Sequence, residues 1–108
     1  MPLIESSEVE PVEMLPGVFR RTMTDGEKMM LCEVRMTKGS VVPMHTHPHE
    51  QTGYCVSGRI RMVIADEVRE MGPGGCWMIP GGVEHEATAL EDSVFIDIFS
   101  PPREEYRV

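Results

Sequence analysis

Three of the four histidines of this chain are spaced so that they can bind one metal ion. His45 and His47 stand two residues apart in GSVVPMHTHPHEQTGYCVSG, so an extended strand would project both imidazoles from the same face. His85 follows a Pro-Gly turn in GGCWMIPGGVEH and can complete a compact cluster. Neutral imidazoles suit Zn, Ni, Fe, Cu or Mn. The pattern therefore predicts a transition-metal site.

The segments that must position these histidines have the pattern of an all-β protein. Apolar and polar residues alternate in short runs between Gly, Pro and Asp turns, and no stretch has the period of a long amphipathic helix. Ala65-Asp66-Glu67 suits a hairpin turn, and residues 94–99 are apolar on both faces, as in a central buried strand. The expected strands are 30–37, 59–64, 68–71, 76–79 and 94–99. We therefore expect a β-sandwich or barrel, with at most a helical turn in the tail.

Length and charge limit what the protein can be. The chain of 108 residues suffices for one domain with one core. We expect an N-terminal arm of residues 1–16 and a single domain of residues 17–108. The net charge of −8 argues against a nucleic-acid partner, because binding phosphates needs a basic surface. No apolar run approaches the roughly 20 residues of a membrane span, so we expect no membrane partner.

The cysteines and the N-terminal segment bear on the cellular compartment. Cys32, Cys55 and Cys76 are widely spaced, odd in number and form no CxxC pair, which favours reduced thiols. The acidic stretch MPLIESSEVEPVE has neither the basic nor the apolar region of a secretory signal. We therefore expect a cytoplasmic protein.

The histidines lie in a framework of glycines and prolines that resembles both motifs of the cupin superfamily. The motifs are Gly39-x5-His45-x-His47-x3-Gln51-x6-Gly58 and Gly74-x5-Pro80-x-Gly82-x2-His85. The resemblance implies a small single-domain cupin: a jelly-roll barrel, or double-stranded β-helix, with one divalent transition metal ion (Zn, Ni, Fe or Mn) in its mouth. Cupins commonly pair through their sheets and N-terminal arms, so the resemblance also implies a homodimer.

Three neighbouring residues compete to be the fourth metal ligand. Where cupins usually carry glutamate, this chain has Gln51, with Glu50 one residue earlier and His49 two earlier. The spacing from Gln51 to Gly58 keeps the motif register and favours Gln51, which leaves His49 as a neighbouring or surface histidine. Three imidazoles and an amide oxygen cancel none of the metal's charge. We therefore expect a strong Lewis acid that suits an anionic substrate better than it suits oxygenase chemistry.

Asp97 and Arg103, in VFIDIFSPPREEY, could supply groups that a metal alone lacks. Strand alternation places Asp97 on one face with Phe95 and Phe99, where burial would raise its pKa and make it a candidate general acid or base. The forked guanidinium of Arg103 suits a carboxylate. The residues alone leave two other interpretations open: an ion pair between Asp97 and Arg103, or a solvated Arg103.

HTHPHEQ followed by Asp-x-Phe-Ser/Thr-Pro-x-Arg-Glu resembles the pectin-degradation cupins of the KdgF type. That family opens the rings of 4,5-unsaturated uronates to linear keto acids, and its active-site aspartate and arginine match Asp97 and Arg103. The resemblance implies a metal-dependent, isomerase-like enzyme with a small anionic substrate such as a sugar acid. The alternatives are a metal-dependent dioxygenase of a small organic acid or phenol, and a non-catalytic metal- or sugar-binding cupin. We expect Trp77 and Met78 in the core, while Tyr54 could line the pocket or pack.

Overall fold

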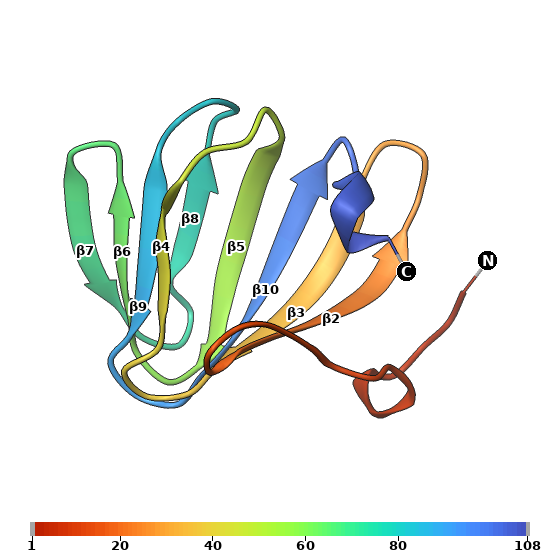
Figure 1. Cartoon of the computed structure of the whole chain (residues 1–108), viewed down its shortest axis with the longest axis horizontal. Coiled ribbons are helices and arrows are strands. Elements are labelled where there is room, and N and C mark those ends of the chain that lie inside the picture. Colours follow the sequence, from red (N-terminus) through yellow and green to blue (C-terminus); the bar gives the residue numbers. More distant parts are fainter. Residues whose placement is uncertain (1, 108) are drawn as a thin grey trace.

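The computed structural model describes residues 2–107 and consists of two antiparallel β-sheets packed together (Figure 1). The larger sheet has the strand order β1-β2-β3-β10-β5-β8, and the smaller sheet has the order β4-β9-β6-β7. The strands are β1 (Val12–Leu15), β2 (Val18–Asp25), β3 (Met30–Met36), β4 (Val41–His45), β5 (Glu50–Ser57), β6 (Ile60–Ile64), β7 (Glu67–Met71), β8 (Cys76–Ile79), β9 (His85–Ala89) and β10 (Ser93–Ser100). The described range contains no α-helix, only 3-10 turns at Ser6–Glu8 and Glu104–Tyr106. The expected all-β jelly-roll fold is confirmed.

The alternation of apolar residues places the strands well. In β3 every second residue is buried, and β10 lies between β3 and β5, as its two apolar faces predict. The expected hairpin turn is formed by Ala65 and Asp66, between β6 and β7, with Ala65 at a φ of 54°. Two-residue hairpin turns favour positive φ because their backbone twist then matches that of the flanking strands. The tail forms the single helical turn that the sequence allowed.

Inward-facing side chains from both sheets form the main core, and a smaller cluster extends it toward the C-terminus. The main core includes Val18, Met36, Cys55, Ile60, Ile79 and Phe95, all at most 4% exposed. In the smaller cluster, Met30, Cys32 and Phe99 pack with Tyr106 of the C-terminal turn. Apolar burial therefore holds this turn against the barrel, where Figure 1 shows it folded back beside β2 and β3.

Gly58 shows why the first motif ends in glycine. Its φ is 91°, and a Cβ there would lie 2.3 Å from Oγ of Ser93 and 2.4 Å from the carbonyl oxygen of Asp92. A side chain would therefore clash with its neighbours as well as strain the backbone. Because Gly58 separates β5 from β6, it helps to set the position of the strand that carries Gln51.

Part of the predicted N-terminal arm belongs to the larger sheet. β1 pairs with β2 at the sheet edge, with Val12 opposite Arg20. Just before β1, Nε of Arg21 donates a 2.9 Å hydrogen bond to the carbonyl of Val9. The division into arm and domain stays a prediction, and its outer limits, residues 1 and 108, lie outside the described range. No helix in that range has the length and apolar character needed to cross a membrane.

Candidate metal centre and the pocket beside it

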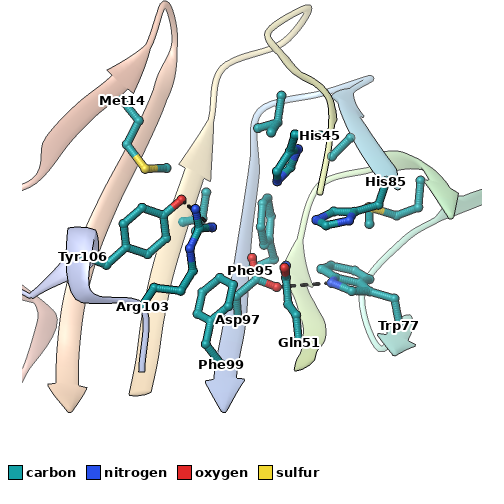
Figure 2. Close-up of a pocket in the computed structure, with 14 residues that line it drawn as sticks. Met14, His45, Gln51, Trp77, His85, Phe95, Asp97, Phe99, Arg103 and Tyr106 are labelled. Carbon is teal, nitrogen blue, oxygen red and sulfur yellow. Dashed lines mark hydrogen bonds between the residues drawn. The ribbon is translucent and has the colours of Figure 1, made fainter. Parts of the chain in front are cut away.

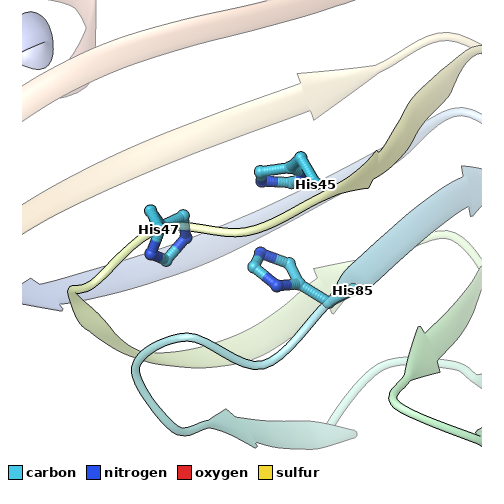
Figure 3. A group of neighbouring side chains, drawn as sticks. All are labelled: His45, His47 and His85. Atoms are coloured by element: carbon cyan, nitrogen blue, oxygen red, sulfur yellow. The ribbon is translucent and has the colours of Figure 1, made fainter.

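The three motif histidines meet at one place in the barrel (Figure 3). His45 ends β4, His47 lies in the following loop, and His85 begins β9. β4 and β9 are neighbours in the smaller sheet, and their pairing sets His45 opposite His85. One nitrogen from each ring lies within 4.8 Å of the nitrogens of the other two. The strands thus form the histidine cluster that the spacing predicts.

Backbone carbonyls orient all three rings. Each imidazole donates from Nδ1 to a carbonyl oxygen 2.9–3.0 Å away. The acceptors are Pro43 for His45, His49 for His47 and Val83 for His85. Hydrogen bonds of this kind fix the tautomer of metal-binding histidines and leave the Nε2 lone pair free. Nε2 of His85 is buried without a hydrogen-bond partner in the described residues, and a metal ion would satisfy it.

Burial favours the neutral form of His47 and His85. It lowers the pKa of His85 to about 4, because a charged imidazole would lose its hydration there. Burial also lowers the pKa of His47, and the charge of Arg103 lowers it further. Near neutral pH a metal ion then displaces no proton from either ring. The donors fit a divalent transition metal ion such as Zn, Ni, Fe or Mn.

Gln51, on β5, places its amide between the histidines and a buried carboxyl group. Its Oε1 lies 3.0 Å from Nε2 of His47, and its amide nitrogen donates to Asp97. Since Nδ1 of His47 carries the proton, Nε2 and Oε1 are two lone-pair atoms that face each other. Such a pair suits neighbouring ligands of one cation, with bonds of about 2.1 Å to each. The structure therefore brings Gln51 to the histidine cluster.

The two residues that compete with Gln51 in the sequence lie outside this cluster. Among the described residues, neither His49 nor Glu50 belongs to the side-chain group that could hold a metal ion. Glu50 is exposed at the start of β5. His49 instead provides the backbone carbonyl that holds Nδ1 of His47. That contact does not depend on the identity of the side chain, so no sequence motif could reveal it.

Asp97 is buried in the pocket wall, as strand alternation predicts. It lies on β10, is 5% exposed, and accepts a 3.2 Å hydrogen bond from Nε1 of Trp77 at Oδ1. Burial raises the pKa of Asp97 to about 6, although hydrogen bonds from Gln51 and Trp77 and the charge of Arg103 favour the ionised form. Near neutral pH this group can therefore both accept and release a proton.

Arg103 packs on aromatic rings rather than pairing with Asp97. Its guanidinium carbon lies 4.1 Å from the ring centre of Tyr106 and 5.2 Å from that of Phe99. One guanidinium nitrogen, Nη1, donates to the Tyr106 hydroxyl at 3.0 Å. Within residues 2–107 its one ion pair is with the exposed Glu105, and its side chain is only 12% exposed. An Asp97–Arg103 pair and a solvated Arg103 are therefore both wrong, because the C-terminal turn carries the guanidinium over the rings.

These groups line one pocket of about 60 Å³ (Figure 2). Most of its wall is apolar, and its ionisable or polar groups come from His45, His85, Gln51, Asp97, Arg103, Trp77 and Tyr106. Figure 2 shows Gln51 and Asp97 between Arg103 and the histidines. A mostly apolar pocket with a few convergent polar groups is the usual form of a small-molecule site.

Trp77 connects the core to this pocket. It is buried, as expected, but it also lines the pocket and hydrogen bonds Asp97. Gly53 makes room for the indole, because a Cβ there would lie 2.0 Å from Nε1 of Trp77. The expectation that Met78 is a core residue is wrong: alternation on the edge strand β8 turns it outward, and it is 53% exposed. Tyr54 also faces outward and does not line the pocket.

Tyr106 and Met14 are among the pocket residues that were not predicted from the sequence. Tyr106 stands three residues after Arg103, a spacing that brings two side chains together in a helical turn, so this pattern could have identified it. Met14 lines the pocket from β1. No motif distinguishes it, because it reaches the pocket only through the pairing of β1 with the sheet edge.

A jelly-roll barrel that holds three convergent histidines defines a class of small metal-binding β-proteins. In agreement with this, residues 32–99 match the model of the Cupin domain family. The chain therefore belongs to the cupin family.

Within this family the chain is similar to KdgF proteins over most of its length. The pectin degradation protein KdgF of Dickeya dadantii (strain 3937) is 32% identical over 96 residues, which cover 87% of each chain. The structure of KdgF from Halomonas sp. superposes with a TM-score of 0.95 over 99% of both chains, at 31% identity. Oxalate decarboxylase OxdC of Bacillus subtilis (strain 168) is 27% identical over 85 residues, but these cover 73% of this chain and 22% of that protein.

Proposed function

We propose that this protein is a metal-dependent enzyme that opens 4,5-unsaturated uronates to linear keto sugar acids. The observation that carries the proposal is the contact sequence from His47 through Gln51 to Asp97, with Arg103 in the same pocket. Lone pairs for a cation, a carboxyl group that titrates near neutral pH and an anion-binding group thus surround one small space. The likeness to KdgF, a pectin degradation protein, supports the substrate class.

In this proposal His45, His47, His85 and Gln51 hold one divalent transition metal ion: Zn, Ni, Fe or Mn. Such an ion supplies a Lewis acid that polarises substrate oxygen atoms. The three imidazoles and the amide are neutral, so they leave the charge of the ion uncompensated and favour an anionic substrate. Oxalate decarboxylase of Bacillus subtilis, a cupin-like relative, has Mn(II) centres.

Asp97 moves the protons of the reaction. Ring opening breaks the bond between the ring oxygen and the anomeric carbon, and the anomeric hydroxyl loses its proton as the aldehyde forms. The released enol oxygen becomes a ketone when the neighbouring carbon gains a proton. Substrate and product have the same composition, so one group can take up the first proton and deliver the second. Burial raises the pKa of Asp97 to about 6, which suits both transfers near neutral pH.

Arg103 binds the carboxylate of the substrate. Its guanidinium is largely buried in the pocket wall, and Nε has no hydrogen-bond partner in the described part of the chain. A carboxylate can accept hydrogen bonds from the Nε edge of a guanidinium in a two-point geometry. This contact anchors the substrate in the pocket, with its ring facing Asp97 and the histidines.

The test is to supply unsaturated galacturonate to metal-loaded protein and follow the loss of ultraviolet absorbance of the conjugated enol. We expect acceleration over buffer that disappears after chelation of the metal and returns when the metal is restored. A rate equal to that of buffer with fully loaded protein would contradict the proposal.

Two other functions would give different results in companion measurements. A dioxygenase would consume oxygen with a small organic acid or phenol. A non-catalytic cupin would bind the uronate in calorimetry without changing it. Loss of absorbance without oxygen uptake excludes both.

We also propose that the protein is a cytoplasmic homodimer. The outer face of the larger sheet carries Tyr54, Val56 and Met78 on the adjacent strands β5 and β8, and these side chains are 49–53% exposed. A second copy could cover this face. The three free cysteines agree with a reducing compartment. Sedimentation of the purified protein tests the dimer, and a single species with the 12.2 kDa mass of one chain would contradict it.

A further inference from the structure

A second arginine contacts the tyrosine that holds Arg103. The guanidinium carbon of Arg20, on β2, lies 4.3 Å from the ring centre of Tyr106, and that of Arg103 lies 4.1 Å from the same centre. Both guanidinium groups therefore contact the same aromatic ring. We call Arg20, Tyr106 and Arg103 the arginine–tyrosine stack.

Arg20 is a buried cation with few compensating contacts. It is 5% exposed, and no ion pair of the described residues includes it. Its Nε donates to the hydroxyl of Thr22 at 3.1 Å, and its guanidinium faces the Tyr106 ring. Burying a cation without a carboxylate partner destabilises a fold, although a cation–π contact offsets part of this. The buried charge of Arg20 is therefore better explained by a role in the pocket than by a role in stability.

Thr22 extends the same contacts to the backbone of the C-terminal turn. Its hydroxyl donates to the carbonyl oxygen of Tyr106 at 2.7 Å while it accepts from Arg20. Arg107, the residue after Tyr106, forms a 3.0 Å ion pair with Asp25 at the end of β2. β2 therefore fixes both the backbone and the ring of Tyr106.

The stack determines how much freedom Arg103 retains. A solvated arginine loses rotamer entropy when it binds a carboxylate, and this loss weakens binding. Here the Tyr106 ring, its hydroxyl and Phe99 already hold the guanidinium, while Nε stays unpartnered in the described residues. The guanidinium is thus preorganised, and one of its donors is buried without a partner in the described residues.

We propose that Tyr106 and Arg20 are positioning residues for the anion-binding side of the pocket. Tyr106 holds Arg103 in the orientation that receives the substrate carboxylate, and Arg20 supports the Tyr106 ring and adds positive charge to this end of the barrel. The identity of the anion, an unsaturated uronate, rests on the proposed function. The positioning of Arg103 does not.

Steady-state kinetics with unsaturated galacturonate tests the effect on binding. In Tyr106→Leu and Arg20→Met we expect KM to rise about tenfold while kcat changes less than about twofold. Arg20→Lys, which keeps a cation on the ring, should restore most of the affinity. Because Met removes an unpaired buried cation, Arg20→Met should unfold at the same or a higher temperature than wild type. Arg21→Met, at the neighbouring outward-facing position, is the matched control and should keep the wild-type KM.

Two kinetic results would overturn the positioning role. One is a wild-type KM in both Tyr106→Leu and Arg20→Met. The other is a fall in kcat that accompanies lower thermal stability, because a purely structural role produces that pattern.

Nuclear magnetic resonance tests the same inference without substrate. The Nε–H signal of Arg103, assigned by its loss in Arg103→Lys, should exchange slowly with water in wild type. In Tyr106→Leu and Arg20→Met it should exchange at least about tenfold faster, because the guanidinium is released. Unchanged exchange would overturn the inference even if the enzyme is active. Faster exchange in a protein that does not turn over the uronate would support the positioning of Arg103 and refute only the proposed function.

Discussion

The two sides of the pocket are built in different ways. On the histidine side, the pairing of β4 with β9 sets His45 opposite His85, and main-chain carbonyls orient every imidazole. On the opposite side, Arg103 comes from the C-terminal turn and is held by side chains, chiefly by the ring and hydroxyl of Tyr106. The first side is fixed by the fold itself. The second depends on side-chain contacts, so single substitutions can test it.

Burial shifts the pKa values of His85 and Asp97 in opposite directions. It lowers the pKa of His85 to about 4 and raises the pKa of Asp97 to about 6, because in both cases it disfavours the charged form. Neutral His85 can therefore bind a cation, and the carboxyl group of Asp97 can hold a proton. Gln51 touches both sides, with its oxygen near His47 and its amide nitrogen on Asp97. A substitution of Gln51 should therefore affect both the histidines and Asp97.

The largest effect is expected from removing one metal ligand. His85→Ala should lower metal affinity by at least about 100-fold and reduce uronate turnover to the rate in buffer, because it breaks the three-imidazole set. Metal analysis after gel filtration measures the first effect, and the absorbance assay measures the second. His49→Ala is the matched control. It removes an imidazole of the same loop but keeps the backbone carbonyl on His47, so full metal content is expected. Equal metal loss in both variants would contradict the assigned ligand set.

The next largest effect is expected from Asp97→Asn, which removes the proton-carrying group without changing a metal ligand. The amide can still accept from Trp77 but cannot carry the proton, so kcat should fall by about 100- to 10,000-fold. Metal content should stay at the wild-type value, because no metal ligand is changed. Full activity in this variant would show that another group moves the proton.

A smaller effect is expected from Gln51→Glu, which adds a negative charge where the two sides meet. The carboxylate should bind the cation more tightly, and repulsion should raise the pKa of Asp97 further. The added negative charge should also weaken the attraction of the pocket for the anionic substrate and raise its KM by about tenfold. Metal titration and the pH profile of kcat measure these effects. An unchanged KM and pH profile would mean that the neutrality of Gln51 has no role in substrate binding.

The smallest effect concerns the stability of metal-free protein. The contributions of His85 and Asp97 to the free energy of unfolding should depend on pH in opposite directions. As the pH falls from 6.5 toward 4, protonation of the unfolded chain at His85 removes stability. As the pH rises from 3.8 through 6, ionisation of Asp97 in the unfolded chain removes stability, because the buried carboxyl group of the folded protein still holds its proton. Asp97→Asn should therefore raise the free energy of unfolding by about 2–3 kcal/mol near neutral pH and by much less near pH 4. Urea denaturation at the two pH values measures this, and an equal gain at both would refute the burial of a charged Asp97.

The sequence predicts the histidine side better than the arginine side, for a physical reason. His45 and His85 lie at strand ends, His47 follows two residues after His45 in the loop, and Gly58, whose φ of 91° favours glycine, ends the first motif. These are local properties that a spacing pattern records. The buried position of Asp97 follows from the same alternation.

The surroundings of Arg103 depend on contacts between distant segments. Arg20 and Tyr106 meet only because the C-terminal turn folds back onto β2, and the spacing of Arg103 and Tyr106 gives no indication of Arg20. Met78 shows the opposite error, since an apolar residue beside a motif suggests a core position. The edge strand β8 instead turns it outward.

The most direct test of the central claim is a crystal structure of metal-loaded Asp97→Asn with unsaturated galacturonate. We expect one ion bound by Nε2 of the three histidines and by Oε1 of Gln51, with bonds of about 2.0–2.3 Å. The substrate carboxylate should accept from Nε of Arg103, with the ring oxygen facing residue 97. An ion held without Gln51, or a carboxylate bound away from Arg103, would contradict the claim that both sides of the pocket act on one substrate.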